Sequence, residues 1–204
     1  MSEAMSEAVS DAVSTAGTGE PDPSTTSGSR RRSGTAHATL GCMITTTYTA
    51  RPIAPGALAE LRVTDDAGRR TTPFTEAEGG DPLRCCLRRS APGERLALVS
   101  YAPLRRWAAE TGSDPGAYDE QGPVFVHAGP CPAPADGTLP FTGVHRTVRR
   151  YSADGRILGG RLVEDPSPEG FEKAFREAFD DPVVALVHVR AVEYGCFLYE
   201  VRRD

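Results

Sequence analysis

The sequence has no excess of positive charge, no long apolar run and no basic leader, and each of these shortages excludes a class of protein. Lys173 is the one lysine among 204 residues, and the formal net charge is -5. Such a chain lacks the positive surface that neutralises a phosphate backbone, so we expect no nucleic-acid partner. No stretch approaches the roughly 20 apolar residues of a membrane-spanning helix, and the N-terminus lacks the basic start and apolar core of a secretory signal peptide. We therefore expect a cytoplasmic protein with no membrane partner.

The short motifs of several common enzyme classes are also missing. The sequence contains no Gly-Lys-Ser/Thr phosphate loop, no Gly-x-Ser-x-Gly nucleophile elbow and no His-Glu-x-x-His helix. No repeat of solenoid length is visible. These absences leave the reaction, if there is one, open.

Residues 1–42 differ in composition from everything that follows. The segment opens with four-residue units such as Met-Ser-Glu-Ala and continues in Gly, Ser, Thr and Pro up to three arginines at 30–32. It has too little apolar surface to offset the entropy lost on ordering. We therefore predict a disordered tail over 1–42 and one globular domain over 43–204. The alternative is that translation begins at Met43, where the patterned sequence starts.

From Met43 onward, strand-like runs alternate irregularly with short helices. Hydrophobic patterning predicts strands over 44–49, 96–101, 123–128, 144–151, 157–164, 183–190 and 196–202, with a hairpin turn at Asp154-Gly155. Helices are expected over 56–62 and 104–111, and a third helix carries Phe171, Phe175 and Phe179 on one face. Because helices do not alternate regularly with strands, the pattern predicts a single α+β domain with a mainly antiparallel sheet and a few short helices.

The last two strands sort their side chains into two faces if Arg190 pairs with Cys196. One face is then apolar and includes Val189 and Phe197, as a core requires. The other face is half polar, which is typical of the solvent side of an antiparallel sheet. That face carries His188, Arg190, Cys196 and Glu200.

Cysteines and histidines are the candidates for chemistry, since thiols stay reduced in a cytoplasmic protein. Cys85 and Cys86 are adjacent, and neighbouring side chains of an extended chain point to opposite faces, so at most one is expected at a shared site. The arginines at 84, 88 and 89 favour a thiolate there. His127 ends a predicted strand, and Cys131 follows in a loop stiffened by two prolines. Such a loop suits a reactive or ligating group.

Three interpretations of these residues remain open. The first is a thiol-dependent small-molecule enzyme with Cys86, Cys131 or Cys196 as nucleophile and His127 or His188 as base. The second is a zinc or iron site that draws its ligands from the same five residues. In the third, the residues only pack within a non-catalytic interaction or ligand-binding module. The cofactor is left unknown by all three.

From Met43 onward the chain resembles a bacterial family known as domain of unknown function 1203. The resemblance rests on Asp-Pro-Leu-Arg-Cys-Cys-Leu-Arg at 81–88, Pro-Gly-Glu at 92–94, Leu-Val-Ser-Tyr-Ala-Pro at 98–103, Gly-Pro-Val-Phe-Val-His-Ala at 122–128 with Cys131, and Tyr-Gly-Cys-Phe at 194–197. The segment over 105–116 is longer than the family pattern leads us to expect. The resemblance brings no established activity.

The family pattern falls on Arg84, Cys86, His127, Cys131 and Cys196. We therefore predict that Cys86, His127, Cys131 and Cys196 converge as the catalytic or metal-binding residues. Arg84, His188 and Arg190 are expected nearby as binding residues for a small molecule.

Overall fold

The computed structural model describes residues 48–132, 134 and 138–203. The tail predicted over 1–42, and most of the strand expected at 44–49, lie outside the described residues. Within the described part of the chain, no helix is both long and apolar enough to span a bilayer.

The three predicted helices and the six strands predicted between residues 96 and 202 are confirmed, with ends displaced by no more than two residues, whereas a two-residue strand at Phe74–Thr75 was not predicted. The three α-helices are α1 (Pro55–Leu61), α2 (Pro103–Thr111) and α3 (Pro168–Phe179), and a short 3-10 helix, η1, covers Gly116–Tyr118. The strands are β1 (Phe74–Thr75), β2 (Arg95–Tyr101), β3 (Gly122–His127), β4 (Arg146–Ser152), β5 (Ile157–Val163), β6 (Val184–Ala191) and β7 (Phe197–Arg202).

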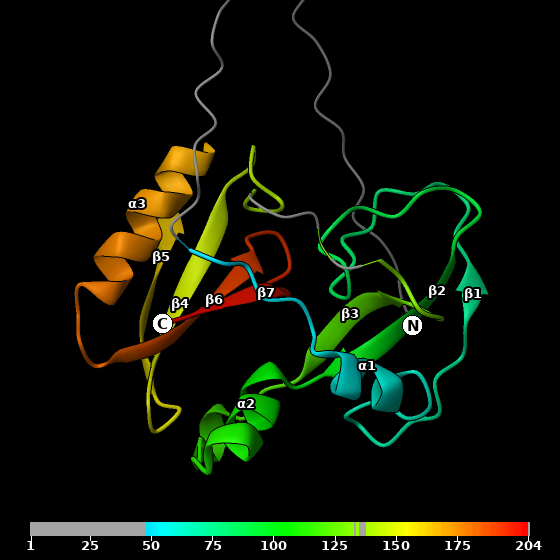
Figure 1. Ribbon diagram of the computed structural model, residues 1–204, viewed down its shortest axis with the longest axis horizontal. Coiled ribbons are helices and arrows are strands. Elements are labelled where there is room, and N and C mark those ends of the chain that lie inside the picture. Colours follow the sequence, from blue (N-terminus) through cyan, green and yellow to red (C-terminus); the bar gives the residue numbers. More distant parts are fainter. Residues whose placement is uncertain (1–47, 133, 135–137, 204) are drawn as a thin grey trace, which may run out of the picture. The chain divides into compact units, whose positions relative to one another are not determined.

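The strands form two antiparallel sheets, which confirms the α+β class (Figure 1). One sheet has the order β1-β2-β3 and the other the order β5-β4-β6-β7. The β4–β5 hairpin turns at Gly155, whose φ of 76° is one that glycine adopts without strain.

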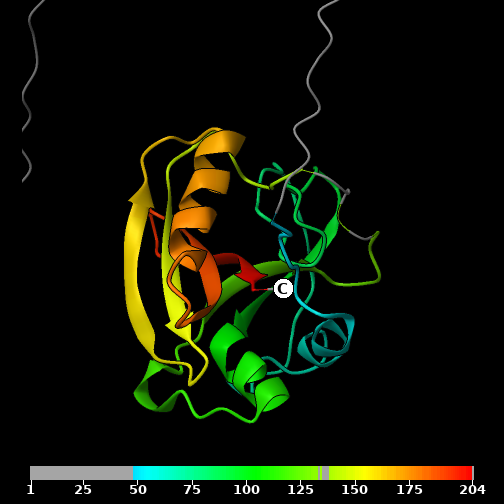
Figure 2. The same cartoon turned by 60° about the vertical axis from the view of Figure 1, so that its left-hand side comes forward.

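Helix α3 lies along one face of the four-stranded sheet (Figure 2). It begins with Ser167 as N-cap, whose side chain accepts a hydrogen bond from the Gly170 N–H, and Pro168 follows in the first turn. The predicted aromatic stripe faces inward, and Phe171 and Phe175 are fully buried against the sheet. The stripe is therefore core packing.

A second apolar core lies against the three-stranded sheet. It joins α1, strands β2 and β3, both adjacent cysteines and Phe197 at the start of β7. An isolated bridge between Leu83 and Phe125 lays the segment that carries the cysteines beside β3. The position of Cys85 and Cys86 is thus set by packing on this sheet.

The register of the last hairpin differs from the prediction. Val189 pairs with Tyr199, and a bulge then places Arg190 opposite Phe197 instead of opposite Cys196. The bulge puts Phe197 on the face of Arg190, and Leu198 packs in the core under α3. A sequence pattern of period two does not reveal such an inserted residue.

The half-polar face of this hairpin is buried and is not the solvent side. His188 is fully buried, and Arg190 and Glu200 are each 8% exposed. Helix α2 covers part of the same face, where Leu104 and Trp107 pack with side chains of β4 and β6. Polar side chains are therefore enclosed between this sheet and its neighbours.

Candidate functional site

Two cysteines are presented by a tight turn that follows the bridge to β3. The Leu83 N–H donates to the carbonyl of Arg88 (2.8 Å), and the Leu87 N–H donates to the carbonyl of Leu83 (3.0 Å). Leu87 closes the turn in the left-handed region, with φ of 56°. The chain at Cys85 and Cys86 is therefore curled and not extended.

His127 and Cys131 approach from the opposite side of the cluster. His127 is the last residue of β3, and the chain leaves the sheet just beyond it, after the Ala128 N–H has donated to the carbonyl of Arg95 (2.9 Å). Cys131 lies in the connection that follows. The end of β3 thus fixes the position of the imidazole, and the residues that follow bring the Cys131 sulfur close to it.

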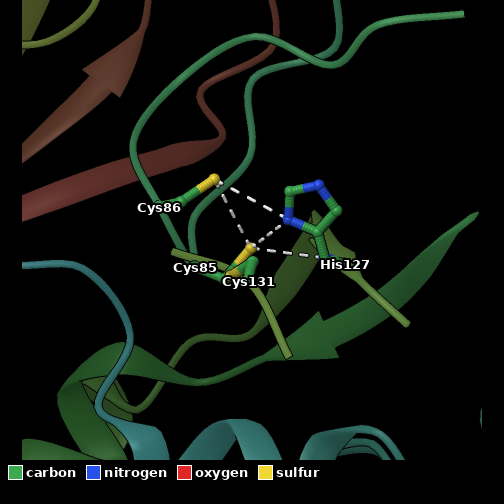
Figure 3. Close-up of side chains that lie close together, drawn as sticks. All are labelled: Cys85, Cys86, His127 and Cys131. Atoms are coloured by element: carbon green, nitrogen blue, oxygen red, sulfur yellow. Dashed lines mark hydrogen bonds between the residues drawn. The ribbon is translucent and has the colours of Figure 1, made fainter. Parts of the chain in front are cut away.

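The ligand atoms of Cys85, Cys86, His127 and Cys131 all lie within 4.8 Å of one another (Figure 3). The Nδ1 atom of His127 is 3.3 Å from the Cys85 sulfur and 3.7 Å from the Cys86 sulfur. The two adjacent sulfurs are 4.0 Å apart. Three thiols and one imidazole nitrogen therefore surround a common point.

Cys85 is the site residue that sequence reasoning left out. The rule that neighbouring side chains diverge holds for an extended chain, but the turn over 83–88 directs both sulfurs to the same side. The Cys85 sulfur also accepts a hydrogen bond from the backbone N–H of His127 (3.2 Å). The Cys-Cys pair itself was the visible signal, and its spacing resembles no familiar metal motif.

Three of the four residues are buried and Cys131 is half-buried, and two arginines contact His127. Cys85 and Cys86 are 5% and 4% exposed, and His127 is 8% exposed. Arg62 donates from Nε to the carbonyl of His127 (3.1 Å). Arg88 places NH2 3.1 Å from Nε2 of His127 and pairs with Glu94, whose carboxylate is 3.5 Å from the same Nε2.

The two adjacent thiols share one proton unequally. The Cys85 thiol donates to Cys86, and this hydrogen bond is the main cause that lowers the pKa of Cys86 to about 6 and raises the pKa of Cys85. Burial raises the pKa of Cys131. The hydrogen bond from Cys85 thus favours the thiolate form of Cys86.

The remaining residues predicted for the site lie elsewhere in the structure. Cys196 is outside the group of four, and its sulfur contacts the carbonyl of Tyr194 (3.8 Å). Arg84 is buried and turns away from the cluster, since its Nε donates to the carbonyl of Phe197 (2.7 Å). Burial lowers the pKa of Arg84 to about 10. His188 and Arg190 lie on the buried polar face of the four-stranded sheet.

The chain belongs to the family described as "Protein of unknown function (DUF1203)", which matches residues 80–203. The match covers more than half of the chain and includes all four clustered residues together with Arg88 and Glu94. No curated protein matches the chain, and no solved structure matches it.

Proposed function

We propose that Cys85, Cys86, His127 and Cys131 bind one zinc ion and that this centre holds the domain together. The observation that carries the proposal is the set of distances between the ligand atoms. Tetrahedral zinc, with bonds of about 2.3 Å to sulfur and 2.0–2.1 Å to nitrogen, requires S···S separations near 3.8 Å and S···N separations near 3.6 Å. Among Cys85, Cys86 and His127 the S···S separation is 4.0 Å and the two S···N separations are 3.3 and 3.7 Å, and the Cys131 sulfur lies within 4.8 Å of each of these atoms.

The charge around the cluster supports the same conclusion. Three thiolates and one zinc ion carry a net charge of about −1, and Arg62 and Arg88 both reach His127. The backbone N–H of His127 gives the Cys85 sulfur a further donor. These groups favour deprotonated sulfur, which is the form that binds metal.

Glu94 fits the role of the carboxylate that orients a metal-bound histidine. When Nδ1 of His127 binds a metal, Nε2 carries the proton and needs an acceptor. The Glu94 carboxylate is 3.5 Å from Nε2 and is held by Arg88 at 2.5 Å. Arg88 carries only hydrogen-bond donors, so Glu94 is the group available to accept this hydrogen bond.

The ligand set indicates a structural centre. Four protein ligands fill a tetrahedral shell, whereas a catalytic zinc keeps one position for water or substrate. The ligands come from the 83–88 turn, from the end of β3 and from the segment beyond it. Zinc would therefore tie the 83–88 turn to the end of β3 and the residues just beyond it, which are distant from that turn in the sequence.

The test is elemental analysis of the native, untagged full-length chain, with thiol titration before and after denaturation. We expect close to one zinc per chain, protected thiols at Cys85, Cys86 and Cys131, and a Cys86→Ser variant that loses the metal. Cobalt substitution should give the absorption bands of tetrahedral cobalt-thiolate coordination. Protein that contains no metal and takes up neither zinc nor cobalt would overturn the proposal.

A second candidate function is a nucleophilic Cys86, which the lowered pKa of this thiol favours. Its 4% exposure disfavours direct attack on a substrate. The same titration separates the two candidates, since a nucleophile predicts metal-free protein in which Cys86 is alkylated much faster than Cys85.

A further inference from the structure

A second polar group lies far from the cysteines in sequence, on the buried face of the four-stranded sheet. His188 of β6 pairs with Arg149 of β4 on one side and with Glu200 of β7 on the other. Directly paired residues project from the same face of a sheet, and so does Arg190, two positions along β6. Two arginines and a histidine therefore share one enclosed surface.

Several buried polar atoms on this face have no hydrogen-bond partner among the described residues. They are both ring nitrogens of His188, Nε of Arg190 and the hydroxyl of Tyr151. The Tyr151 and His188 rings are in contact, with centroids 4.6 Å apart. Unsatisfied buried polar atoms are rare because each one costs desolvation energy. Nε2 of His188 lies 3.8 Å from the Glu200 carboxylate, beyond hydrogen-bonding distance, so a polar group bound on this face would satisfy these atoms.

The two arginines beside His188 depend on a single carboxylate. Arg149 and Arg190 both donate to the same oxygen of Glu120, and Arg149 does so at 2.5 Å. Glu200 is held by Arg202, which also pairs with Glu110. One carboxylate thus serves two guanidinium groups, of which Arg190 is only 8% exposed.

Glu120 is suited to leave this position. Its side chain is 41% exposed, and it lies between the 3-10 helix and β3 in the connection that follows α2. Arg190 remains anchored without it, because its NH1 donates to the carbonyl of Gly195 (2.7 Å). A ligand could therefore replace Glu120 while the arginines keep their places.

We propose that Arg149 and Arg190 form a binding site for an oxyanion, a carboxylate or phosphate group of a small molecule, which displaces Glu120 and reaches His188. The planar guanidinium groups match the paired oxygens of such a group. Burial, and then Arg190 and Arg149, lower the pKa of His188, so its neutral ring supplies one N–H to the ligand. This proposal is independent of the zinc centre.

The test is calorimetric titration of the full-length chain with inorganic phosphate and, separately, with acetate, at constant ionic strength. Glu120→Gln removes the internal competitor and should tighten binding of at least one anion by about tenfold or more. Adding Arg149→Gln to that variant should abolish the gain. The anion that binds more tightly then indicates whether the ligand carries a phosphate or a carboxylate group.

Glu110→Gln is the matched control, since it removes a carboxylate of the neighbouring ion pair with Arg202 and should bind as the wild type does. If Glu120→Gln fails to fold, Glu120→Asp shortens the competing side chain and should tighten binding in the same direction. Equal binding by the wild type and the Glu120 variants, or a gain that survives Arg149→Gln, would overturn the proposal.

Discussion

The two sheets enclose polar side chains in opposite ways. Beside the three-stranded sheet, the cysteines and His127 contact one another, and the atoms that would bind a metal are mutual neighbours. On the four-stranded sheet, His188 is equally buried but both ring nitrogens lack a hydrogen-bond partner within the described residues. We propose a cation as the ligand of the first set and an anion as the ligand of the second. Burial alone therefore does not distinguish two sites that need opposite ligands.

The largest expected effect is loss of a metal ligand. Cys86→Ser should lower the free energy of unfolding by at least about 3 kcal/mol, because metal binding is part of the folding free energy of a structural site. Denaturant unfolding combined with metal analysis measures the effect. Cys196→Ser is the control, since this partly exposed cysteine lies outside the cluster, and it should change stability by less than about 0.5 kcal/mol. Equal effects of the two substitutions would contradict a stabilising metal.

A comparable loss is expected where the four-stranded sheet depends on apolar packing. Phe175→Ala should cost about 3–5 kcal/mol because it leaves a cavity under α3. The exposed Lys173→Ala on the same helix should be nearly neutral. The folded Phe175 variant should keep its full metal content. Loss of zinc from that variant would show that the two cores do not act separately.

A smaller effect should follow from the hydrogen bond to His127. Glu94→Gln should weaken zinc binding by about 10–100-fold, since outer carboxylates orient metal-bound histidines. Competition with a chromophoric chelator measures the affinity, and Glu78→Gln serves as a control on an exposed carboxylate. Unchanged affinity would remove Glu94 from the centre.

The smallest effect is on the pH dependence of stability. Burial lowers the pKa of His188 below its unfolded value of 6.5, so the unfolded state binds the proton that the folded state excludes. His188 therefore lowers stability as pH falls below about 6.5, by up to about 1.4 kcal/mol per pH unit, and has no effect above that pH.

Other charged groups face the same histidine. Glu200 is buried with a raised pKa and acts in the opposite direction above its unfolded value of 4.5, and Arg190, Arg149 and Arg202 add to the lowering of the His188 pKa. We therefore compare the slope of the free energy of unfolding against pH between the wild type and His188→Asn, since Glu200 is present in both. Urea unfolding from pH 5 to 8 measures it. Parallel curves would mean that His188 is protonated equally in both states.

Hydrophobic periodicity predicted the three α-helices and strands β2 to β7, but it predicted neither the two-residue strand β1 nor the geometry of the sites. The stripe on α3 and the strand runs follow from local pattern, because each element buries one face. Convergence of His127 and Cys131 was also expected, since a strand end and the loop beyond it stay close together. The arrangement of the candidate site residues depends instead on irregular backbone geometry.

Two local departures from regular geometry account for what was missed. The 83–88 turn rotates Cys85 toward Cys86, and no periodic rule describes a curled segment. The bulge at Arg190 moves Phe197 to the other face of β7, which a strict alternation assigns wrongly. The role of Glu120 was also invisible, because its partners Arg149 and Arg190 are distant in sequence.

The left-handed conformation of Leu87 limits which residues can vary beside the cysteines. Its backbone would suit glycine, yet its side chain is buried in the core under α3, next to the turn that presents both sulfurs. Glycine would relieve about 1–2 kcal/mol of backbone strain but would leave a cavity where the leucine side chain packs. Branching at Cβ makes the left-handed conformation still less accessible. The position therefore tolerates leucine or methionine better than valine or isoleucine of similar hydrophobicity, so a single side chain couples the cysteine turn to the opposite core.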